Sequence, residues 1–126
     1  MRFVNPLPFV ADIGRSKTFY ADVLGLQVEE DHGNFVTFSN GFALHDGASL
    51  TQTIFGKPPS TTDPYGRQNL VLYFESDDIR DAFERISPHA DVIHPIRKQS
   101  WGQLVFRFYD PDGHVVEVGE PHVSPD

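Results

Sequence analysis

The stretch from Asp110 to Val118 constrains the fold more than any other part of the chain. Asp-Pro-Asp-Gly places proline where a type I turn needs its fixed φ, and glycine where the backbone must reach a positive φ. With a glycine bulge after the turn, the predicted hairpin loop is Pro111 to Gly113. In that register Arg107 on the first strand lies directly opposite Glu117 on the second.

Alternation of side chains along these two strands separates two faces. One face reads as a hydrophobic core: Phe106, Phe108, Val116 and Val118. The other face mixes apolar groups with an arginine and a carboxylate: Val105, Arg107, Tyr109, Val115 and Glu117. Alternation also places Trp101 and Gln103 on the side of Arg107. An apolar surface with a few convergent polar groups is typical of a ligand cavity.

Two helices are predicted, each with an aspartate at its start. Asp12 is a candidate N-cap for a helix whose apolar residues recur at helical spacing until Gly25. Ser76-Asp77-Asp78 offers caps for a second helix over Ile79 to Ile86, which Pro88 ends.

Short apolar segments bounded by turn residues predict eight strands. They are Arg2–Val10, Leu26–Glu30, Asn34–Ser39, Phe42–Asp46, Gln68–Glu75, Asp91–Arg97, Gln103–Tyr109 and His114–Gly119. Pro6 and Pro8 cannot donate ladder hydrogen bonds, so the first strand is expected at an edge or irregularly paired. The order strand, helix and three strands therefore occurs twice.

This order predicts an α+β fold in which two βαβββ modules, related by a pseudo-twofold repeat, form a curved mixed sheet around a cavity. We expect one domain over residues 1–126, with module one at about 1–47 and module two at about 67–120. We expect a linker or lid at about residues 48–66, with a short helical turn around Leu50 to Phe55. We expect a short tail at residues 121–126. Aligning Gly41 with Gly113 makes His45 the counterpart of Glu117.

Charge and composition limit the partners. The net charge of −8 argues against nucleic acid and anionic membrane surfaces. There is no cysteine for disulfides or thiolate chemistry. The longest apolar run, Leu70 to Phe74, is too short to span a bilayer, and the N-terminus lacks a signal-peptide pattern. We therefore expect a cytoplasmic protein with a small organic molecule as its partner.

Several motifs resemble those of the vicinal oxygen chelate superfamily, which includes glyoxalase I, bleomycin- and fosfomycin-resistance proteins and extradiol dioxygenases. The matching residues are Asp12-Ile13, Ser16, Phe19-Tyr20, Leu24-Gly25-Leu26, Phe108 to His114, and Glu117-Val118. The opening from Met1 to Tyr20 is especially similar to bacterial glyoxalase I. The resemblance implies paired βαβββ modules around a cavity, often in homodimers.

In metal-dependent members, four ligands come from the first and fourth strands of the two halves. By position these places fall on Asn5, His45, Asn69 and Glu117. Only Glu117 has the residue type that glyoxalase I would show there. The resemblance thus leaves two alternatives: one divalent metal held by His45 and Glu117 and completed by substrate or water, or no metal. Arg107 beside Glu117 would repel a cation.

Three functions remain open. The first is a glyoxalase-like, lyase-type protein in which Glu117 moves a proton next to a carbonyl, while Tyr73, Trp101 and Arg107 shape the site. The second is a metal-free sequestration protein similar to bleomycin-resistance proteins, with an acidic surface that attracts a cationic ligand. The third is a domain with a closed cavity that acts through its dimer surface. For Glu117 itself, a structural ion pair with Arg107 is the alternative to a chemical role.

Overall fold

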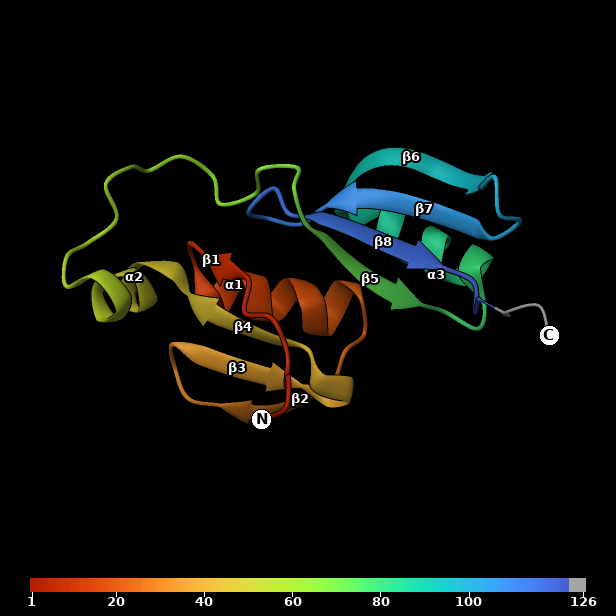
Figure 1. The fold of residues 1–126 in the computed structure, drawn as a ribbon. Coiled ribbons are helices and arrows are strands. Elements are labelled where there is room, and N and C mark those ends of the chain that lie inside the picture. The colour runs from red at the N-terminus through yellow and green to blue at the C-terminus, as the bar shows by residue number, and fades with distance from the viewer. Residues whose placement is uncertain (123–126) are drawn as a thin grey trace. The chain divides into compact units, whose positions relative to one another are not determined.

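The computed structural model describes residues 1–122 and divides into two compact units, Met1–Tyr65 and Gly66–Asp126 (Figure 1). Each unit contains one four-stranded mixed sheet together with helices. The same strand order occurs in both sheets, first-fourth-third-second within the module. The α+β fold of repeated modules that the sequence predicts is confirmed.

Unit 1 begins with the short strand β1 (Phe9–Val10) and the helix α1 (Ile13–Thr18), which continues as the π-helical turn η1 (Phe19–Val23). The strands β2 (Val28–Asp31), β3 (Phe35–Phe38) and β4 (Ala43–Asp46) follow, with the 3₁₀ turn η2 (Ser39–Gly41) between the last two. β1 pairs with β4 in parallel, and the other pairs are antiparallel. Asp12 caps α1 as predicted, accepting a hydrogen bond from the backbone N–H of Arg15.

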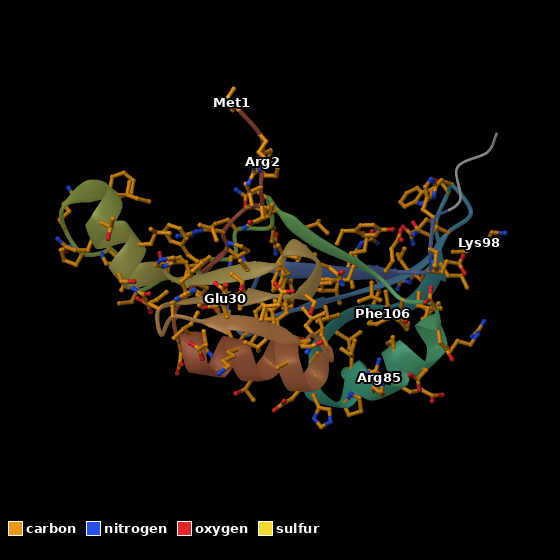
Figure 2. All side chains as sticks on the ribbon, turned by 90° about the horizontal axis from the view of Figure 1, so that it is seen from below. Met1, Arg2, Glu30, Arg85, Lys98 and Phe106 are labelled. Atoms are coloured by element: carbon orange, nitrogen blue, oxygen red, sulfur yellow. The ribbon has the colours of Figure 1, made fainter. Side chains whose placement is uncertain are left out.

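The predicted first strand, Arg2 to Val10, is wrong over most of its length, because only Phe9 and Val10 form a strand. Pro6 and Pro8 lack the N–H groups that a ladder needs, so pairing begins only where Pro8 offers its carbonyl oxygen to the N–H of His45, at 3.2 Å. Figure 2 shows Met1 and Arg2 projecting away from the sheet of unit 1. Asn5 therefore does not lie in the middle of a strand.

The helical turn expected around Leu50 to Phe55 is instead a nine-residue helix, α2 (Gly47–Phe55), which occupies the start of the expected linker. Asp46 caps it by accepting from the N–H of Ser49, and Gly56 ends it at a φ of 75°. Gly47 is required because an added Cβ would lie 2.4 Å from the ring of Tyr65. Capping residues at both ends of a weakly amphipathic segment were the signal for this helix.

Unit 2 contains β5 (Val71–Glu75), α3 (Ile79–Ile86), the 3₁₀ turn η3 (Ser87–His89), β6 (Asp91–Lys98), β7 (Leu104–Tyr109) and β8 (Val115–Gly119). β5 starts three residues later than predicted, after Gln68 at a φ of 58°. Asp78 caps α3 by accepting from the N–H of Asp81. The predicted hairpin register is confirmed, with Arg107 opposite Glu117.

The hairpin loop of unit 2 is closed from inside by a buried aspartate. Asp110 Oδ1 accepts from the backbone N–H groups of Asp112 and His114, and the N–H of Gly113 donates to the Asp110 carbonyl. Gly66, where unit 2 begins, donates its N–H to the carbonyl of Asp112 at 3.0 Å. A Cβ on Gly66 would meet the carbonyl oxygen of Gly113 at 2.0 Å, so only glycine permits this approach.

One face of the sheet in unit 2 is covered by α3. Phe106, Phe108, Val116 and Val118 are buried there, as predicted, and the rings of Phe83 and Phe106 meet edge to face at 5.1 Å. Figure 2 shows Phe106 and Arg85 near one another, Phe106 on the sheet and Arg85 on the helix that covers it. Side-chain alternation leaves the opposite face of the same sheet open. Between residues 1 and 122, no helix is long and apolar enough to cross a membrane.

Candidate functional site

A row of four polar side chains crosses the open face of the sheet in unit 2. Strand registers place Tyr73 opposite Glu117, Glu117 opposite Arg107, and Arg107 opposite His94. Residues directly opposite on neighbouring strands share one face, so the row points away from α3. The turn chemistry of Asp110 to Gly113 sets the register that brings Arg107 and Glu117 together.

Arg107 is held by three acceptors. Its Nε donates to Glu117 Oε1 at 2.7 Å, Nη1 to His94 Nε2 at 2.9 Å, and Nη2 to Gln99 Oε1 at 3.3 Å. His94 Nδ1 donates to the carbonyl of Pro95 at 2.7 Å, so the ring accepts at Nε2 as the neutral Nδ1–H tautomer. The predicted ion pair is present and mostly shielded, with Arg107 25% and Glu117 14% exposed at the side chain.

A second network runs from the loop between β6 and β7 to the end of β5. The indole N–H of Trp101 donates to Gln103 Oε1 at 2.8 Å, and Gln103 Nε2 donates to the hydroxyl of Tyr73 at 2.8 Å. Tyr73 in turn donates to Glu75 Oε2. The four side chains form one directed chain of hydrogen bonds that ends on a carboxylate.

The chain of hydrogen bonds changes the acidity of its last two members. Burial, and then the hydrogen bond to Glu75, raise the pKa of Tyr73 above its ordinary value. The hydrogen bond from Tyr73, supported by the N–H of His122, lowers the pKa of Glu75. At neutral pH the site therefore presents an ionised Glu75 and a neutral phenol.

These groups border an open hollow of about 650 Å³. Its lining residues are Tyr73, Glu75, Trp101, Gln103, Glu117 and His122. Of the residues that the sequence predicts for the site, Tyr73, Trp101 and Glu117 lie in this lining, and Arg107 lies directly behind Glu117. Asn69 is exposed, two residues before β5, and is not part of the lining.

Sequence reasoning missed three residues of the hollow, Glu75, Gln103 and His122, as functional candidates. Glu75 lies two residues after Tyr73 on β5, so alternation places it on the same face. Its carboxylate also accepts a hydrogen bond from the backbone N–H of His122, which is far away in sequence. Gln103 is buried, with 7% of its surface exposed. A signal for it was present, because Gln103 shares the predicted face of Trp101 and Arg107.

The remaining two predicted residues belong to unit 1. His45 lies in β4, opposite both Phe9 and Phe35, and its Nδ1 donates to the carbonyl of Asp46 at 2.9 Å. Asn5 donates to the carbonyl of Pro6 at 2.8 Å and borders a different hollow of about 270 Å³, which Glu29, Glu30 and residues of β3 and β4 also line. That Asn5 and His45 join Glu117 in one site stays a prediction.

The donor set fits a divalent metal poorly. Glu117 is engaged by a guanidinium whose positive charge opposes a metal ion at the same carboxylate. The two asparagines offer only neutral amide oxygens, which bind transition metals weakly. Across the described range 1–122, no three His, Asp or Glu side chains are grouped so that they could hold a metal ion.

Comparison with known proteins places this chain in a family. The family model of the glyoxalase-like domain matches residues 3–122. No curated protein sequence gives a significant match. A crystal structure of a protein of unknown function from Agrobacterium tumefaciens str. C58 is similar over 97% of this chain and 95% of its own, with 58% identity and a TM-score of 0.93.

Two more distant structures share the fold. A glyoxalase/bleomycin resistance protein/dioxygenase from Nocardioides is 21% identical, with a TM-score of 0.72 over 99% of this chain and 91% of its own. A lactoylglutathione lyase from Agrobacterium tumefaciens is 24% identical, with a TM-score of 0.63 over 94% of this chain and 92% of its own. These two likenesses show the fold, and the match of the family model over nearly the whole sequence shows that the chain belongs to the glyoxalase-like domain family.

Proposed function

We propose that this protein binds a small organic cation, without a metal, in the hollow on the open face of unit 2. The observation that carries the proposal is the direction of the hydrogen bonds in the lining. The N–H of Trp101, both hydrogens of the Gln103 amide and the O–H of Tyr73 already have acceptors within the chain. The lining therefore offers a ligand acceptors and aromatic faces rather than these donors.

The charge of the lining supports a cationic ligand. Glu75 and Glu117 both border the hollow, and Arg107 compensates only Glu117. Trp101 and Tyr73 are 54% and 46% exposed as whole residues, so both can offer an aromatic surface for cation–π contact. The net charge of −8 adds a long-range attraction for cations.

Binding agrees with the geometry of Glu117 better than proton transfer does. A general base needs a carboxylate that is free to take a proton from the substrate. Glu117 Oε1 is instead bonded to Arg107 at 2.7 Å, and the same guanidinium is fixed by His94 and Gln99. The arrangement holds the Glu117 carboxylate in place as part of the wall of the hollow, which agrees with a binding role.

A charge series of matched size tests the proposal. Benzamidine, benzamide and benzoate have similar shapes but are cationic, neutral and anionic at pH 7. Trp101 is the single tryptophan of the chain and lines the hollow, so its fluorescence reports occupancy directly. We expect benzamidine to bind about tenfold or more tightly than benzamide, with benzoate weakest, because a charge-assisted hydrogen bond contributes about 1.5–3 kcal/mol.

Two variants locate the binding. Glu75→Gln keeps an acceptor for Tyr73 but removes the charge, and should weaken benzamidine about tenfold. Glu84→Gln makes the same change on α3, on the covered side of the sheet, and should leave binding unchanged. Equal binding of all three compounds, or equal effects of the two variants, would refute the cationic site.

A further inference from the structure

We infer that Gln103 is the positioning residue of the hollow: its amide fixes the indole of Trp101 and the hydroxyl of Tyr73, and thereby makes the lining selective against ligands that carry only acceptors. The selectivity among ligands rests on the proposed function. The fixing of Trp101 and Tyr73 by Gln103 can be measured in the ligand-free protein, so this role and the proposed function can fail separately.

The amide of Gln103 has only one orientation that satisfies its neighbours. The indole N–H of Trp101 can only donate, so it requires the amide oxygen. The carbonyl of Glu120 can only accept, so it requires the amide nitrogen, which it meets at 2.6 Å. The second hydrogen of that nitrogen is then directed to the Tyr73 hydroxyl at 2.8 Å. One side chain thus fixes two aromatic groups on different elements.

Gly119, which has no side chain, leaves room for this amide. An added Cβ on Gly119 would lie 2.6 Å from Gln103 Nε2, so a side chain at the last position of β8 would displace the amide from this place. Gln103 is buried, while Trp101 next to it in the loop is more than half exposed. Within residues 1–122 the hydrogen bond to Gln103 is the indole's polar anchor. Removing the amide should therefore release the ring.

The direction of the network gives Gln103 its effect on selectivity. With the amide present, the Trp101 N–H is occupied and the Tyr73 hydroxyl donates to Glu75. Without it, the indole N–H becomes available to a carbonyl or carboxylate of a ligand. Gln103→Met keeps the length of the side chain but cannot accept from Trp101 or donate to Tyr73 and Glu120.

The positioning is tested first without ligand. In Gln103→Met we expect the Trp101 emission to shift to longer wavelength and acrylamide quenching to rise. Gln99→Met is the matched control in the same loop, since Gln99 contacts Arg97 and Arg107 rather than Trp101. Its emission should remain that of the wild type. Unchanged emission in Gln103→Met, with a folded circular dichroism spectrum, would overturn the inference.

The phenol of Tyr73 gives a second, independent readout. Donation from Gln103 lowers the pKa of Tyr73, against the raising effects of burial and of the carboxylates Glu75 and Glu117. Gln103→Met should therefore raise the pKa of Tyr73 further, as seen in the ultraviolet difference between each protein and its Tyr73→Phe derivative. A lowered or unchanged value would contradict the assigned direction of the hydrogen bond.

A second variant, Gln103→Glu, separates the contact with Trp101 from the contact with Tyr73. It also tests the inference if Gln103→Met does not fold. A carboxylate can still accept from Trp101 but cannot donate to Tyr73. We expect near-native emission together with a raised pKa of Tyr73. If emission changes while the phenol does not, Gln103 does not act as described.

Ligand binding then tests the selectivity. The preference for benzamidine, which only donates hydrogen bonds, over benzoate, which only accepts them, should fall about three- to tenfold in Gln103→Met, which corresponds to about one hydrogen bond. If the wild type shows no preference but both ligand-free readouts move, the proposed function fails and the positioning role stands. If the preference is present and survives in Gln103→Met, the selectivity assigned to Gln103 is refuted.

Discussion

The two units have the same strand order but carry different types of side chain at equivalent positions. In unit 1, His45 on β4 lies between Phe9 on β1 and Phe35 on β3. In unit 2, the corresponding Glu117 on β8 lies between Tyr73 on β5 and Arg107 on β7. The first row pairs a histidine with two rings, and the second joins a carboxylate, a cation and a phenol.

This difference shows that the repeated module fixes where side chains project without fixing what they do. His45 satisfies its Nδ1 on the backbone of its neighbour Asp46, at 2.9 Å. Glu117 depends on a side chain from another strand, and that partner depends on His94 and Gln99 in turn. A connected polar network on one unit is therefore the better indication of a binding face than position in the repeat.

Removing Glu117 and His45 in turn should have very different effects on stability. Glu117→Met leaves Arg107 without its carboxylate in a largely shielded place, so we expect a loss of about 2–4 kcal/mol in the free energy of unfolding. His45→Met removes one local hydrogen bond and should cost about 1 kcal/mol. Urea denaturation measures both values.

A double variant shows whether the larger loss comes from the stranded charge. Arg107→Met combined with Glu117→Met removes the ion pair as a whole and should recover most of the stability, because apolar groups of similar size often replace such pairs at little cost. Additive losses in the double variant would contradict this explanation.

The helix caps are expected to behave alike in the two units. Asp12 and Asp78 accept from the N–H three residues ahead at 3.0 and 3.1 Å, respectively. Asp12→Ala and Asp78→Ala should each reduce the free energy of unfolding by about 1 kcal/mol. Thermal melts of the two variants would measure both losses, and unequal losses would mean that the two helices are not equivalent in the repeat.

The dependence of stability on pH should differ between the units on the alkaline side only. Hydrogen bonds lower the pKa of Asp31 in unit 1, chiefly from Lys17, and of Glu75 in unit 2, chiefly from Tyr73. Their contributions are present above the ordinary values of 3.8 and 4.5 and are lost as the pH falls through the lower folded values.

Tyr73 adds an alkaline loss. Because its pKa is raised in the folded protein, its contribution is complete below the ordinary value of 10.0 and is lost as the pH rises through the folded value. Melting temperatures from pH 3 to 11 for the wild type, Glu75→Gln and Tyr73→Phe would check both signs. An alkaline slope that persists in Tyr73→Phe must come from another group.

The smallest expected effect is that of metal ions. If Arg107 takes the place of a cation beside Glu117, then zinc, nickel and manganese should leave the melting temperature of chelator-treated protein unchanged. A bound metal at one hundred times its dissociation constant would add about 2.7 kcal/mol of stability. A clear stabilisation would revive the alternative in which His45 and Glu117 hold a metal.

Local chemistry made much of the fold predictable. The residues Asp110 to Gly113 determine the type and length of the hairpin loop. The loop in turn determines the register that pairs Arg107 with Glu117. Asp12 and Asp78 marked two helix starts for the same reason, since caps act over three residues. The first strand failed because a favourable apolar pattern outweighed the two prolines in the prediction.

The site was less predictable because its contacts join distant residues. Glu75 meets His122, and Gln103 meets Tyr73 and Glu120, through tertiary packing that no local spacing encodes. The resemblance supplied Glu117 but also pointed to Asn5 and Asn69, which lie outside β1 and β5. Position in the family pattern therefore did not predict where these two asparagines lie in the fold.

The two prolines that shorten β1 have a consequence for colloidal behaviour. The segment before β1 carries Phe3 and Val4 at 84% and 71% exposure, a composition that would ordinarily invite strand addition from another chain. Pro6 and Pro8 interrupt its row of N–H donors, so the arm cannot template a continuous cross-β ladder. We therefore expect these prolines to limit aggregation through this exposed apolar segment at high protein concentration.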